Sequence, residues 1–124
     1  HNLENQAEQL RRTYFPYLPS RLSVMFGVSK LSDFSTWAET LKIDKDSVIY
    51  EVHFDGFAPE LDSYYLRGNA AYIHNGTEST EEIIRLHMQV NENLFKYWAG
   101  NRSEQPMLEL LIPLPATIGK RVSL

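Results

Sequence analysis

Apolar residues recur along the chain with two different periods, and the helical period marks three segments. Residues 2–14 combine helix-favouring residues with one apolar face. Residues 33–41 and 80–98 carry apolar side chains three and four positions apart, which is typical of amphipathic helices. Ser32 and Ser79 stand directly before the last two segments, where a serine side chain caps a helix. We therefore predict three helices.

The strand period marks further segments. Residues 22–28 and 48–54 alternate between side chains of opposite character, and residues 107–112 are almost continuously apolar. We predict strands in all three, with 48–54 and 107–112 as the central ones, and a last strand around 118–123. Between 57 and 77, the segments SYYL and AAYIH are interpreted as two short strands.

The order of these elements predicts a single mixed domain over residues 1–124. Helices and strands do not alternate regularly, so the fold class is α+β, with central antiparallel or mixed strands on which the helices pack. A chain of 124 residues, 43% hydrophobic and 23% charged, is large and apolar enough to bury such a core. The side chains expected to be buried are Phe34, Trp37, Tyr50, Val52, Ile83, Leu86, Val90 and Leu94.

The segment FPYLPSRLSVMF, residues 15–26, is a rigid connector between the first helix and the first strand. Pro16 and Pro19 each fix a backbone angle and lack an N–H, so the segment suits neither a helix interior nor a central strand. A rigid connector holds the residues that follow it, among them Arg21, in a defined place. Arg21 either forms a surface ion pair with a carboxylate or projects into a cleft.

Two other residues also allow a structural and a functional interpretation. Glu109 lies within an apolar run, where a carboxylate is costly unless it is paired or reaches a solvated cleft. The alternative is an edge strand from which Glu109 points to water. Trp98, at the end of the third helix, belongs either to the core or to the wall of a pocket near Glu109.

Composition narrows the kinds of chemistry and partner. The chain has no cysteine, which excludes disulfides and thiolate metal sites and suits a reducing compartment, so we expect a cytoplasmic protein. The four histidines have no metal-ligand spacing, and we predict no metal site. A net charge of −4 argues against broad nucleic-acid binding. No run approaches a membrane span, so no membrane partner is expected.

Several segments together resemble bacterial and phage ADP-ribosyltransferase-like domains. The resemblance covers nearly the whole chain in order and is carried by RRTYFPYLPSRLSVMF (11–26), LSDFSTW (31–37), IYEV (49–52), YWAG (97–100) and LELLI (108–112). It implies the α+β fold of that family and NAD as a co-substrate. It also implies ADP-ribosyl transfer to a macromolecular acceptor, for which the acidic net charge favours a protein over a nucleic acid.

The resemblance also implies roles for particular residues. Glu109 corresponds to the catalytic glutamate of the family, and Ser23 to the strand position after its P-S-R turn. Arg21 would bind the pyrophosphate of NAD, since a planar guanidinium donates pairs of hydrogen bonds to phosphate oxygens. Trp98 would cover the nicotinamide or the adenine ring.

One part of the family pattern is not found. A first strand with an arginine or histidine that contacts NAD should precede the helix at 2–14, and we do not assign that role to His1. We therefore expect an upstream strand, or a second chain that completes the fold. The alternative function is a non-catalytic α+β interaction module, either a pseudoenzyme or a subunit of a complex.

Overall fold

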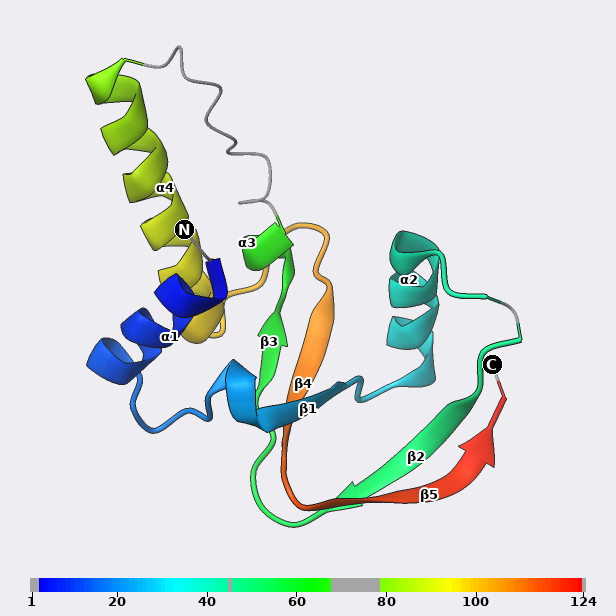
Figure 1. Cartoon of the computed structure of the whole chain (residues 1–124). Coiled ribbons are helices and arrows are strands. Elements are labelled where there is room, and N and C mark those ends of the chain that lie inside the picture. The colour runs from blue at the N-terminus through cyan, green and yellow to red at the C-terminus, as the bar shows by residue number, and fades with distance from the viewer. Residues whose placement is uncertain (1–2, 45, 68–78, 124) are drawn as a thin grey trace.

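The computed structural model describes residues 3–44, 46–67 and 79–123, and it is an α+β domain, as predicted (Figure 1). The helices are α1 (Leu3–Tyr14), a 3₁₀ turn η1 (Arg21–Ser23), α2 (Leu31–Leu41), α3 (Tyr64–Arg67) and α4 (Thr80–Trp98). The strands are β1 (Val24–Gly27), β2 (Ile49–Phe54), β3 (Glu60–Asp62), β4 (Leu108–Pro113) and β5 (Ala116–Val122).

The strands form two small antiparallel sheets. β4 lies between β1 and β3, while β2 pairs with β5 in a separate ribbon. In Figure 1, α1 and α4 lie to one side of the three-stranded sheet, and α2 and the ribbon to the other. The prediction that 107–112 is central is confirmed. The same prediction for 48–54 is wrong, because β2 has one strand partner in the described part of the chain.

The long helix α4 follows its sequence signals closely. The Ser79 side chain accepts a hydrogen bond from the backbone N–H of Glu82 at 3.2 Å, and the chain leaves the helix through Gly100 at φ +82°. α2 differs at its start. Lys30 precedes the helix without a side-chain cap, and Ser32 lies inside its first turn. The prediction of Ser32 as the cap is wrong because the backbone of Lys30 already accepts the N–H of Asp33.

The secondary structure between β2 and α4 differs most from the prediction. The last three residues of SYYL lie in the short helix α3 instead of a strand, because the side chain of Asp62 accepts the N–H of Tyr64 and the carbonyl of Ser63 accepts that of Leu66. The strand β3 just before it was not predicted. The segment AAYIH lies outside the described residues.

The hydrophobic core lies between α1, α4 and the three-stranded sheet. Its buried members are Ala7, Phe15, Leu61, Leu66, Leu94, Tyr97, Trp98 and Leu111. Of the eight side chains predicted to be buried, Leu94 is buried and Tyr50 is 49% exposed. The other six are half-buried. Tyr50 is exposed because it stands on the two-stranded ribbon, away from the core.

Asp62 joins the end of β3 to the segment that leads into β4. Its carboxylate is fully buried and accepts backbone N–H groups from Tyr64 at 3.0 Å, Ser103 at 2.7 Å and Met107 at 2.9 Å. Burial alone would raise the pKa of Asp62, but these hydrogen bonds outweigh it and lower the pKa below its ordinary value of 3.8. The start of β4, and with it Glu109, is thereby held in place.

We predict that Asp62→Asn lowers the free energy of unfolding by about 2–3 kcal/mol, because an amide N–H₂ would face a backbone N–H that loses its acceptor. Since the folded-state pKa of Asp62 is lowered, its contribution is present above pH 3.8 and is lost as the pH falls below that value. Urea unfolding at several pH values measures both effects. The exposed Asp55→Asn serves as a control, with an expected change below about 0.5 kcal/mol. Equal losses in the two variants would contradict this role of Asp62.

Candidate functional site

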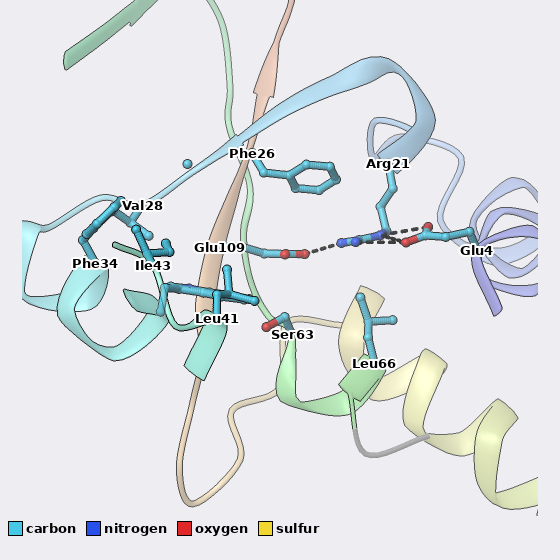
Figure 2. Close-up of a pocket in the computed structure, with 12 residues that line it drawn as sticks. Glu4, Arg21, Phe26, Val28, Phe34, Leu41, Ile43, Ser63, Leu66 and Glu109 are labelled. Atoms are coloured by element: carbon cyan, nitrogen blue, oxygen red, sulfur yellow. Dashed lines mark hydrogen bonds and ion pairs between the residues drawn. The ribbon is translucent and has the colours of Figure 1, made fainter. Parts of the chain in front are cut away.

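A pocket of about 470 Å³ opens beside the three-stranded sheet (Figure 2). It is lined by Glu4, Arg21, Phe26, Gly27, Val28, Phe34, Trp37, Leu41, Ile43, Ser63, Leu66 and Glu109. Most of these side chains are apolar, and the charged ones gather at one end. Figure 2 shows the Glu109 side chain pointing toward Arg21 and Glu4, with an apolar end formed by Val28, Phe34, Leu41 and Ile43 on its other side.

The proline connector delivers Arg21 to the charged end. Ser20 caps the 3₁₀ turn by accepting the N–H of Leu22 at 3.1 Å, and Arg21 is the first residue of that turn. One terminal nitrogen of Arg21, Nη1, donates to the carboxylate of Glu109 and to the hydroxyl of Tyr97, the latter at 2.6 Å. The prediction that Arg21 and Glu109 share one concavity is confirmed.

Glu109 is the second residue of the central strand β4, opposite Leu61 of β3, and is 6% exposed. The alternative in which it points from an edge strand to water is therefore wrong. Burial raises the pKa of Glu109 above its ordinary value of 4.5, and the Arg21 guanidinium and the Tyr97 hydroxyl partly oppose this rise. The site thus holds a desolvated carboxylate beside a fixed positive charge.

Two aromatic rings complete the charged end. The fully buried Tyr97 donates its hydroxyl hydrogen to Glu109, and burial together with the Glu109 charge raises the pKa of that hydroxyl. The guanidinium carbon of Arg21 lies 4.6 Å from the centre of the Phe26 ring and 5.4 Å from that of Tyr97. Both rings therefore lie against the guanidinium.

Glu4 closes the charged end from the first turn of α1. Both of its carboxylate oxygens lie 3.1 Å from Nε of Arg21, and Nη2 lies 3.1 Å from one of them. Sequence analysis missed Glu4 and Tyr97 as site residues. Tyr97 belongs to an apolar helical stripe that predicts core, and an acidic residue in a first helical turn is ordinary.

The structure corrects the expected placement of the two remaining candidates. Trp98 is 2% exposed in the core and donates its indole N–H to the carbonyl of Ala7 at 3.0 Å, so it does not line the pocket. Ser23 is exposed and donates to the carbonyl of Ser20 at 3.3 Å. The tryptophan that lines the pocket is Trp37, whose indole N–H donates to the carbonyl of Leu108 at 2.8 Å.

This arrangement suits a ligand with a flat apolar part and a polar, charged part.

Among the described residues, no group of three or more histidine, aspartate or glutamate side chains is placed to hold a metal ion. No helix in the described part of the chain is long and apolar enough to cross a membrane.

We predict that Tyr97→Phe lowers the free energy of unfolding by about 1–2 kcal/mol, because it leaves a buried carboxylate and a guanidinium each short of one hydrogen bond. The pKa of Glu109 should rise further, because the hydrogen bond from Tyr97 stabilises the ionised carboxylate and the variant lacks it. Urea unfolding and carboxyl ¹³C NMR titration measure the two effects. Tyr17→Phe, at a side chain that is 77% exposed, is the control. If the pKa of Glu109 is the same in Tyr97→Phe, the Tyr97 hydroxyl does not stabilise the ionised form of Glu109.

The sequence was compared with families, curated proteins and solved structures. It matches the DUF2441 family, described as a protein of unknown function, over residues 2–123. No curated protein and no solved structure matches it. Because the match spans nearly the whole chain, the protein belongs to the DUF2441 family.

Proposed function

We propose that this protein transfers ADP-ribose from NAD to a macromolecular acceptor, with Glu109 as the catalytic carboxylate. The observation that carries the proposal is the convergence of Glu109 and Arg21, which lie 88 positions apart in the sequence, in one apolar-walled pocket. A buried carboxylate next to a guanidinium, with aromatic walls, supplies the residue types that this reaction needs.

The reaction replaces one bond at the first carbon of the nicotinamide-bearing ribose. The bond to the nicotinamide nitrogen breaks and nicotinamide leaves with the bonding electrons, so positive charge develops on the ribose, much as in glycoside hydrolysis. A nucleophilic atom of the acceptor forms the new bond and releases its proton. The ionised carboxylate of Glu109 would stabilise the developing charge, and its burial strengthens that interaction.

The remaining pocket residues would bind the rest of the dinucleotide. Arg21 would pair with the pyrophosphate through its planar fork of N–H groups. Phe34 and Trp37 line the apolar part of the pocket and offer flat surfaces to an aromatic ring, the role that sequence analysis gave to Trp98.

The proposal extends to partners and location. The net charge of −4 supports a protein acceptor over a nucleic acid, and the absence of cysteine supports the cytoplasm. A second chain that completes the fold could pair with β1, which is an edge strand among the strands that the structure describes.

A non-catalytic interaction module is the second candidate, and one observation favours it. Each of the three guanidinium nitrogens of Arg21 already has a carboxylate or hydroxyl partner within the chain, as in a purely structural ion pair. An exposed aromatic group at the ends of α1 and α4, formed by Tyr14, Tyr17 and Phe95, would then be a contact surface.

We predict that Glu109→Gln lowers the rate of nicotinamide release from NAD by roughly 10²-fold or more while NAD affinity changes little, because the charge acts mainly on the transition state. The full-length protein is incubated with NAD and cell proteins as acceptors, and nicotinamide is measured by chromatography. In the unchanged protein, activity should fall on acidification with an apparent pKa above 4.5, because protonation removes the charge of Glu109.

Glu60→Gln is the matched control, since it removes one carboxylate from the neighbouring strand β3 outside the pocket lining. It should leave the rate unchanged. Glu109→Gln with full activity would exclude Glu109 as the catalytic carboxylate. Failure of the unchanged protein to bind NAD or to release nicotinamide would favour the interaction module.

A further inference from the structure

Glu4 occupies the edge of Arg21 that a phosphate ligand would need. An arginine binds phosphate or carboxylate best through a pair of parallel N–H groups, and here that pair is Nε and Nη2. Both point at the Glu4 carboxylate, with nitrogen–oxygen distances of 3.1 Å. The third nitrogen, Nη1, is engaged by Glu109 and Tyr97 on the opposite side. In Figure 2 the guanidinium accordingly lies between the two carboxylates.

We propose that Glu4 is a specificity-determining residue that competes, within the chain, with anionic ligands for Arg21. A diphosphate group would bind by displacing the Glu4 carboxylate from Nε and Nη2. The choice of a dinucleotide as the ligand rests on the proposed function, whereas the competition itself concerns any anion that reaches Arg21.

Glu4 is the partner of Arg21 that can leave. Its side chain is 41% exposed, against 8% for Glu109, so water can hydrate the displaced carboxylate. It stands in the first turn of α1, where an acidic side chain is favourable even without the ion pair. Arg21 itself would stay in place, because Glu109, Tyr97 and the Phe26 ring hold it independently of Glu4.

The competition selects ligands by charge. Two carboxylates face one guanidinium in this cluster, so an anion meets a net negative charge there unless it displaces Glu4. A ligand carboxylate gains nothing that Glu4 does not already supply, and Glu4 is attached to the chain at high effective concentration. A diphosphate carries more charge and more acceptor oxygens, so it can replace Glu4 where a single carboxylate cannot. The pocket would therefore exclude carboxylate metabolites while admitting diphosphates.

Calorimetric titration of the full-length protein tests this inference with three probes: inorganic pyrophosphate, acetate and NAD. Glu4→Gln keeps the size of the side chain and removes its charge. We expect Glu4→Gln to bind pyrophosphate about three- to tenfold more tightly than the unchanged protein, the scale of one partly exposed ion pair. We also expect acetate binding to become measurable in Glu4→Gln, and the gain to vanish in the double variant Glu4→Gln/Arg21→Gln.

Glu92→Gln is the control for net charge. It removes one carboxylate from a surface pair with Lys96 on α4, away from the pocket, and should leave pyrophosphate affinity unchanged. Circular dichroism and the melting temperature of each variant show whether the fold is retained, which the partial exposure of Glu4 favours.

The outcomes separate this inference from the proposed function. Equal pyrophosphate affinity in the unchanged protein and in Glu4→Gln, or no binding to either, overturns the competition. If pyrophosphate affinity is equal in the two proteins and NAD also binds both equally tightly, the competition is overturned and the proposed function still stands. Tighter pyrophosphate binding in Glu4→Gln, with NAD bound by neither protein, supports the competition and contradicts the proposed function.

Discussion

The buried ion pair between Arg21 and Glu109 is the interaction on which the rest of the site depends. A carboxylate that is 6% exposed in a central strand would be costly without a compensating charge. Arg21 provides that charge from the turn before β1, and Tyr97 adds a hydrogen bond from α4. Sequence segments that are far apart must therefore fold together before Glu109 can be buried, and the pocket forms where they meet.

The chain around the ion pair is built to place Arg21. Glu8, buried in α1, pairs with Arg11, whose hydrogen bond is the main cause of a Glu8 pKa of about 2. Arg11 also donates to the carbonyl of Leu18 at 2.8 Å and so attaches the proline connector to the helix. Pro19 then limits the path from Leu18 to Arg21. The rigidity inferred from the sequence thus has a structural counterpart, in which α1 holds the connector and the connector positions the guanidinium.

Sequence reasoning succeeded where a signal is local or periodic. The helix α4 could be bounded from its serine cap, its apolar stripe and Gly100, and β4 from its apolar run. It failed where a distant residue decides the local structure. Tyr64–Arg67 is helical because Asp62 and Ser63 supply acceptors, and Asp62 is in turn held by Ser103 and Met107, about forty positions away. Propensity alone could not distinguish that helix from a strand.

The site was predictable only in part, for a related reason. A glutamate within an apolar run needs a compensating positive charge. The resemblance to ADP-ribosyltransferase-like domains places Arg21 in the same site, so the proximity of the two residues could be predicted. Glu4 and Tyr97 join the cluster through contacts that span 17 and 76 positions, and no local pattern marks them. The two tryptophans show the same limit. Both stand on amphipathic helices, and a hydrogen bond to the distant carbonyl of Leu108 holds Trp37 at the pocket.

The chain has two tryptophans, and they allow the central claim, that the Arg21–Glu109 pocket binds NAD, to be tested with one NMR titration. Trp37 lines the pocket, and Trp98 lies in the core away from it. A ¹H–¹⁵N spectrum of the full-length protein therefore contains one indole signal from the pocket and one from the core. Substitution of each tryptophan assigns the two signals. The account predicts that the Trp37 indole signal shifts in a saturable way as NAD is added while that of Trp98 stays unchanged. Indole signals that both stay unmoved at saturating millimolar NAD would contradict it.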